Sequence, residues 1–262
     1  MIIIIFVFGA IIGSFLNMLI WRLPREESIL GRSHCVSCGR TLDGWDLFPL
    51  LSYLFLRGKC RKCKAKIPFR YFLVELIAGA LFVLAWHFRQ PGDLASVALL
   101  LRDWTVIAAF IVTFAVDWEH FLILDNVIFP AAAAVALFNL ASGLLGGNWL
   151  DLSGQFFSGV IGAVLAPLPF FLLWYLSKGR WMGFGDVKLA ILLGMALGWS
   201  LAYVGIMIAV FLGGVAAVAL LLSGRKTLKS KVPFGTFLTV GSLLALFYGQ
   251  KILDWYLSYL GF

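Results

Sequence analysis

The chain has 262 residues, of which 62% are hydrophobic and only 13% are charged, and its mean hydropathy is +0.97. This composition excludes an ordinary soluble domain and predicts an all-α polytopic membrane protein embedded in a lipid bilayer. A net charge of +8 is also typical of nucleic-acid-binding proteins. In a membrane protein, however, basic residues mark the cytoplasmic loops, so we expect no nucleic acid partner.

The first apolar stretch covers residues 2–20 and is long enough to cross a bilayer, which takes about 20 apolar residues. Arg22 and Arg25 follow this stretch and no basic segment precedes it. We therefore predict a retained transmembrane helix over residues 1–21 with its N-terminus outside, rather than a cleaved signal peptide. Near its inner end, the segment Gly13–Asn17 is either a helix-packing face or part of a substrate site.

Residues 22–70 form the only long polar segment and carry eleven of the 21 Lys and Arg residues. We expect this segment to be a cytoplasmic loop domain. Its four cysteines form two CxxC pairs, Cys35 with Cys38 and Cys60 with Cys63. Two such pairs complete the tetrahedral shell that Zn²⁺ prefers, and a closed shell of four thiolates indicates a structural site. The alternative, a pair of disulfides, is disfavoured in a reducing cytosol.

Residues 71–262 are expected to form a seven-helix membrane domain, giving about eight transmembrane helices in all. The predicted helices cover residues 71–87, 99–121, 126–145, 156–176 with a bend at Pro167 and Pro169, 187–197, 201–222 and 234–257. This topology places 18 of the 21 Lys and Arg residues on the inner side, including a basic link at 225–231, and an outer turn at 146–151 that has no Lys or Arg. Such asymmetry is typical of a correct count of crossings. The apolar stretch 48–56 is too short to span and is expected to cover the metal module or lie in the interface.

Two acidic residues lie at the ends of apolar helices. Asp117 follows one apolar run, and Asp186 follows Gly183-Phe184-Gly185 at the start of another. The topology places both carboxylates at the cytoplasmic boundary, where they could share one proton. One carboxylate would then take a proton from water while the other polarises a carbonyl, as in aspartic proteases. Gly183 and Gly185 would let the backbone approach an extended peptide. Alternatively, Asp186 only caps its helix.

Several motifs occur together in an order that resembles the type IV prepilin peptidases, the membrane aspartic endopeptidases with a GxGD motif. The motifs that carry this resemblance are Gly13–Asn17 with Arg22-Leu23-Pro24, the two CxxC pairs, Pro49–Leu54, Arg57–Cys60, Tyr71–Glu75, the Asp117 segment and Gly183–Asp186. The resemblance covers nearly the whole chain. The combination is far more specific than any single motif.

The resemblance implies an enzyme of the bacterial inner membrane that removes the basic leader from prepilins or pseudopilins at the cytoplasmic face. It implies that Asp117 and Asp186 are the catalytic pair. Many members then methylate the new N-terminus with S-adenosylmethionine, but we find no glycine-rich nucleotide loop that would place the methyl donor. One departure is Leu124 before Asp125, where the family often has proline, and this leaves the role of the link open.

Two other classes of function compete with a protease. The acids could bind protons or cations in a transporter, or the chain could be a non-catalytic assembly protein that docks through its zinc loop. Transporters usually place coupling acids near mid-bilayer, in broken helices and related repeats. Here the two acids lie at helix ends and no convincing repeat is present, so the sequence favours the protease.

Overall fold

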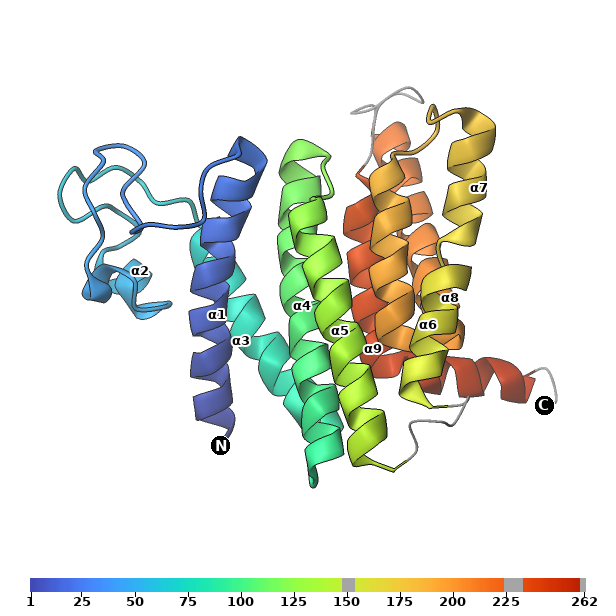
Figure 1. Ribbon diagram of the computed structural model, residues 1–262. Helices are drawn as coiled ribbons and strands as arrows, with labels where there is room; N and C mark the ends of the chain where they lie inside the picture. The colour runs from blue at the N-terminus through green and yellow to red at the C-terminus, as the bar shows by residue number, and fades with distance from the viewer. Residues whose placement is uncertain (148–153, 224–232, 260–262) are drawn as a thin grey trace. The chain divides into compact units, whose positions relative to one another are not determined.

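The computed structural model describes residues 1–147, 154–223 and 233–259, and the regular secondary structure of these residues is helical (Figure 1). Among these described residues, seven helical segments are long and apolar enough to cross a membrane, which confirms the polytopic all-α class. The chain forms two compact units, residues 1–88 and residues 89–262. The basic link at 225–231 and residues 148–151 of the outer turn lie outside the described residues.

Unit 1 pairs two long helices and carries the polar loop between them. Its elements are α1 (Ile2–Arg22), the 3₁₀ turns η1 (Leu23–Arg25) and η2 (Gly44–Asp46), α2 (Leu51–Phe55) and α3 (Arg70–Arg89). A Cβ atom added to Gly9 would lie 2.9 Å from the Cα of Gly79, and one on Gly13 would lie 2.7 Å from the Cα of Glu75. The helix-packing interpretation of Gly13 is therefore confirmed, because only glycines let these two backbones meet.

Unit 2 is a bundle packed around one central helix. Its elements are α4 (Leu94–His120), α5 (Asp125–Leu145), α6 (Gln155–Leu165), α7 (Leu168–Ser177), α8 (Phe184–Leu222) and α9 (Phe234–Tyr259). Fully buried leucines of α8, such as Leu189 and Leu193, meet Phe110 of α4 and Leu238 of α9 in one apolar core. The predicted bend in the fifth helix is confirmed, because α6 and α7 are separated at Ala166–Pro167 and proline cannot continue a hydrogen-bonded helix.

The predicted sixth and seventh helices are two arms of a single element, α8. A straight helix of 39 residues would be about 58 Å long, nearly twice the hydrocarbon core of a bilayer. The backbone of Gly198 is not helical, with φ of 76°, and a Cβ there would collide with the Oγ of Ser158. The glycine therefore breaks the helix between the two predicted segments. The two arms on either side of Gly198 correspond to the predicted sixth and seventh helices, and the seven candidate spans of the described residues count both arms as one 39-residue segment.

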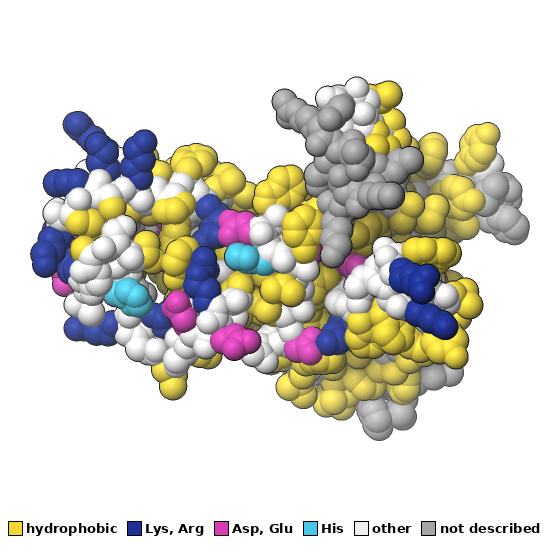
Figure 2. All heavy atoms as spheres, turned by 90° about the horizontal axis from the view of Figure 1, so that it is seen from above, with side chains coloured by type: hydrophobic (Ala, Val, Ile, Leu, Met, Phe, Trp, Pro, Cys, Tyr) yellow, Lys and Arg dark blue, Asp and Glu magenta, His cyan; other side chains and the backbone are white. Residues whose placement is uncertain are grey.

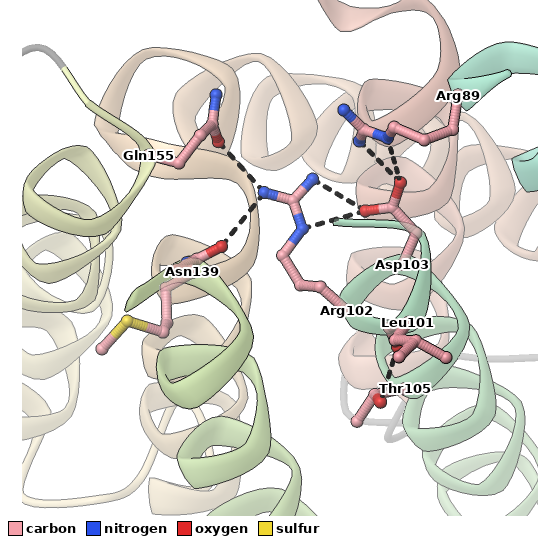
Figure 3. Close-up of polar contacts among 8 residues, drawn as sticks. Arg89, Leu101, Arg102, Asp103, Thr105, Asn139 and Gln155 are labelled. Atoms are coloured by element: carbon pink, nitrogen blue, oxygen red, sulfur yellow. Dashed lines mark hydrogen bonds and ion pairs between the residues drawn. The ribbon is translucent and has the colours of Figure 1, made fainter. Parts of the chain in front are cut away.

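A buried polar network connects four helices of unit 2 (Figure 3). Asp103 Oδ1 accepts hydrogen bonds from Arg102 Nε at 2.9 Å and Nη2 at 2.7 Å, and Asp103 Oδ2 accepts two from Arg89. Arg102 Nη1 donates to Asn139 at 3.3 Å and to Gln155 at 3.0 Å, while Asn139 donates to a backbone carbonyl of α8. Since an unpaired buried charge is costly, this network fixes α4, α5, α6 and α8 against one another.

Candidate active site

Asp117 lies in the last turn of α4 with only 5% of its surface exposed. Its Oδ2 accepts a hydrogen bond of 2.8 Å from the backbone N–H of Thr236, in the first turn of α9. The carboxylate therefore satisfies a free N–H at the positive end of the α9 dipole, as a capping residue does. A Cβ on Gly235 would lie 2.9 Å from the same oxygen. Glycine is thus required for α9 to approach this carboxylate so closely.

Asp186 lies in the first turn of α8 and is 8% exposed. The N-cap of that helix is Gly183, which has no side chain to form a capping hydrogen bond. Gly185 packs against Ile123, the side chain that follows α4: a Cβ on Gly185 would lie 2.9 Å from the Cβ of Ile123, and one on Gly235 would lie 3.0 Å from its Cδ1. Ile123 therefore contacts the starts of both α8 and α9.

These contacts bring the two acids into one site. Gly235, whose Cβ position lies next to Asp117 Oδ2, and Gly185, the residue before Asp186, both pack against Ile123. Both side chains are buried, and they come from the end of one membrane helix and the beginning of another. Two carboxyl groups in such an environment can hold one proton between them, which suits them to acid–base chemistry on a bound substrate.

The link between α4 and α5 is tied to the start of α8 by an ion pair. Lys188 Nζ lies 2.7 Å from Oδ1 and 2.8 Å from Oδ2 of Asp125, the first residue of α5. The carboxyl group of Asp125, which follows Leu124, therefore positions the link next to the candidate site. Half of the Asp125 side chain is exposed, so this pair contributes little to stability.

Sequence reasoning missed Gly235, Thr236 and Ile123. The available signal was a glycine two residues after Pro233, at the predicted start of the last helix. Such a glycine is common at helix starts and does not indicate which carboxylate it will meet. Only the packing of α4 against α9 shows that Gly235 and Thr236 contact Asp117.

The four cysteines of unit 1 lie on two turns with the same backbone geometry. Cys35 N–H donates to the Arg40 carbonyl at 2.8 Å, and Cys60 N–H donates to the Ala65 carbonyl at 2.9 Å. In each turn the residue after the second cysteine donates back to the first, through Gly39 and Lys64. The side chain of Asp46 forms ion pairs with Arg40 at 3.0 Å and Arg61 at 2.9 Å, which joins the two turns.

The thiols of this module fit a metal ion. All four Sγ atoms lie within 4.8 Å of one another, and Cys35 Sγ is 3.9 Å from Cys63 Sγ. Tetrahedral coordination at a Zn–S distance of about 2.3 Å requires S–S separations of about 3.8 Å. Hydrogen bonds from the backbone of Cys63, the backbone of Lys62 and neighbouring thiols lower the pKa of Cys60 to about 6, which favours the thiolate that binds metal. The cysteines are free thiols, so the disulfide alternative is wrong.

The fold and the site define a multi-pass membrane protein that holds two buried carboxyl groups at helix ends and carries a four-cysteine module able to bind a metal ion. The chain belongs to the type IV leader peptidase family: the model of that family matches residues 104–218, and the model of the bacterial peptidase A24 N-terminal domain matches residues 7–88. The chain is thus a membrane peptidase of this class.

Three relatives are each named prepilin leader peptidase/N-methyltransferase. The protein from Aeromonas salmonicida is 31% identical, over 97% of this chain and 93% of its own length. The Bacillus subtilis protein is also 31% identical and is covered over 97% of both chains. The Pseudomonas aeruginosa protein is 30% identical, over 97% of this chain and 92% of its own length. No solved structure matches this chain.

Proposed function

We propose that this enzyme removes the basic leader from type IV prepilins or pseudopilins at the cytoplasmic face of the bacterial inner membrane, with Asp117 and Asp186 as its catalytic pair. The observation that carries the proposal is the convergence of these two buried carboxyl groups from separate membrane helices. The names of the relatives support prepilins as substrates.

The geometry supports a division of roles between the two acids. Asp117 Oδ2 accepts the Thr236 N–H, so the other oxygens of the pair are better placed to hold the shared proton. One carboxylate removes a proton from water, and the oxygen of that water forms a bond to the scissile carbonyl carbon. The protonated acid polarises the carbonyl oxygen. Proton transfer to the amide nitrogen then allows the C–N bond to break.

Exposed aromatic side chains lie near both acids in the sequence and support a site at the membrane boundary. Trp118 and Phe121 follow Asp117, while Trp181 and Phe184 precede Asp186, and all four are exposed. Aromatic side chains favour the interface between lipid and water. A prepilin could keep its apolar helix in lipid there while its cleavage site meets the carboxyl groups and water.

The surface charge of unit 1 supports a cytoplasmic position for the cysteine module. Figure 2 shows Lys and Arg side chains gathered on this module. The exposed basic residues there are Arg32, Arg57, Lys59, Arg61, Lys62, Lys64 and Lys66. Loops with such an excess of basic residues remain on the cytoplasmic side of the membrane.

The proposal also includes a structural Zn²⁺ ion on Cys35, Cys38, Cys60 and Cys63, and N-methylation of the new N-terminus with S-adenosylmethionine. Four cysteine ligands close the coordination shell, so the metal would stabilise the loop rather than take part in peptide cleavage. When bound, S-adenosylmethionine would supply a methyl group from its positively charged sulfur to the neutral N-terminal amine, and the electron pair of the C–S bond would remain on sulfur.

Replacing each acid by its amide tests the catalytic pair. Asp117→Asn and Asp186→Asn should each abolish cleavage of a purified prepilin while membrane insertion and thermal stability persist. Asp254→Asn, at an exposed acid of α9, is the matched control and should cleave normally. A transporter would instead lose proton or cation flux, and an assembly protein would retain its binding partner. Full cleavage by either amide variant would refute the catalytic pair.

A further inference from the structure

An exposed apolar surface covers part of the loop domain in unit 1. Its side chains are Trp45, Phe48, Leu51, Leu54 and Phe55, and we call these five residues the apolar patch. All five are exposed, Trp45 by 79% and Phe55 by 82%. All except Leu54 line one open hollow of about 460 Å³, so the patch is continuous. Large apolar groups that gather on a surface in this way mark an interaction site.

The short helix α2 has one face in the patch and the opposite face fixed to the protein. Leu51 lies three positions before Leu54 and four before Phe55, so these side chains share the outer face. Tyr53 belongs to the inner face. Its ring centroid lies 5.6 Å from that of Phe72 in α3, and its hydroxyl donates to a backbone carbonyl at 3.3 Å. The outer side chains therefore point away from α3.

A hydrogen bond sets the depth of α2 along a membrane helix. The N–H of Leu50 donates to Glu75 Oε2 at 2.8 Å. The helix α3 has 20 residues and is a candidate span, so its length of about 30 Å equals the hydrocarbon thickness of a bilayer. Glu75 lies five residues after its start at Arg70, or about 8 Å along the helix axis. The contact thus places α2 beside the end of a membrane helix, where hydrocarbon meets the lipid headgroups.

Basic side chains follow the patch directly. Arg57, Lys59 and Arg61 are exposed, and Arg61 also lines the hollow. Residues 32–66 hold eight Lys and Arg but only two acids, Asp43 and Asp46, which pair with Arg40 and Arg61. Four thiolates around Zn²⁺ would add a net charge of about −2, so the loop domain stays positive. Lys and Arg stems extend along apolar surfaces while their charged ends reach phosphate groups.

We propose that this surface docks the loop domain onto the bilayer that its own helices cross. The apolar patch lies among the acyl chains, and the neighbouring Lys and Arg side chains bind the phosphates of anionic phospholipids. Charge argues against two other occupants, because a second copy of the chain would bring the same positive charge, and so would the basic leader of a prepilin. Residues 48–56 were expected either to cover the metal module or to lie in the interface, and their exposure favours the interface.

Photo-cross-linking in lipid nanodiscs tests the proposal on the full-length protein. Phe55 is replaced by the photoreactive p-benzoylphenylalanine, and the discs contain a radiolabelled phospholipid. Irradiation should attach lipid at position 55 with a yield about tenfold higher than at Val36, an exposed apolar residue of the loop domain outside the patch. Metal content and prepilin cleavage, measured on the same samples, show that each variant is folded.

The products also identify any other occupant of the patch. Cross-linked dimers would show that the patch is an interface between copies, and label transferred to added prepilin would show a substrate surface. Either result, or lipid labelling no stronger than at Val36, would overturn the docking. Because cleavage is measured separately, these outcomes leave the proposed peptidase activity standing.

A second measurement tests the role of the basic residues. In mixed nanodiscs, labelling at position 55 should favour phosphatidylglycerol over phosphatidylcholine by at least about fivefold, the effect of one basic residue at an anionic surface. Adding Arg57→Gln, which removes the charge next to α2, should reduce this preference while acyl-chain labelling persists. Equal labelling of the two lipids by the protein with Arg57 intact would overturn the proposed phosphate contacts.

Discussion

The substitution Gly235→Ala probes how closely α9 must approach the candidate catalytic carboxylate. In the structure an alanine Cβ at this position lies 2.9 Å from Asp117 Oδ2 and 3.0 Å from Ile123 Cδ1. Ordinary contacts of a Cβ atom begin at 3.4 Å, so the carboxylate or the start of α9 must move by about 0.5 Å. The hydrogen bond from Thr236, now 2.8 Å long, would change with either movement.

The expected effect is larger on catalysis than on folding. Overpacking at a buried site costs about 1–3 kcal/mol of stability, which a folded membrane protein tolerates. A displacement of 1 Å at a reacting group can reduce the rate by about 100-fold, so half that displacement predicts a fall in kcat of about tenfold. The KM for prepilin should change little, because most of the binding surface is untouched.

Steady-state cleavage of a purified prepilin in nanodiscs, with thermal unfolding on the same samples, measures both effects. Gly214→Ala is the control, because no other group lies within 4 Å of a Cβ at that position of α8; its kcat should match the wild type, and its stability should be equal or slightly higher because alanine favours the helix. A Gly235→Ala enzyme that cleaves at the wild-type rate would show that the exact position of Asp117 does not limit catalysis.

Three further predictions concern the structural parts of the molecule. Arg102→Met leaves Asp103 buried with one cation and should lower the free energy of unfolding by about 3–5 kcal/mol. Arg89→Met, at a side chain that is 26% exposed, should lower the free energy of unfolding by less. Equal losses in thermal unfolding would contradict the network. Cys35→Ser should reduce the zinc content and the stability of the loop while leaving peptide cleavage nearly intact, and near-normal zinc by metal analysis would refute the four-thiolate site. Hydrogen bonds from Ser96 lower the pKa of Asp93, the N-cap of α4, so the stability that Asp93 adds is present above its unfolded pKa of about 3.9. The difference in melting temperature between the wild type and Asp93→Ala should therefore shrink as the pH falls below that value. A constant difference would argue against the cap.

The sequence alone determined the class of the molecule and the local chemistry. Long apolar runs indicate membrane helices because the bilayer sets their length, and the bend before Pro167 follows from the ring of proline. The CxxC spacing indicates one four-thiolate site, because each pair lies on one tight turn. Asp117 and Asp186 stand out from the sequence because an ionisable residue at a membrane helix is costly and usually has a function.

Only the tertiary structure decided which distant groups meet. It shows that Gly235 and Thr236 approach Asp117, that Ile123 contacts the starts of α8 and α9, and that α2 is fixed to α3 with its apolar side chains exposed. It also shows that the two predicted helices meet directly at Gly198, where the backbone is not helical. Hydropathy and helical period report on neighbours along the chain. Contacts between helices depend on how their side chains pack, and that packing has no signature in either pattern.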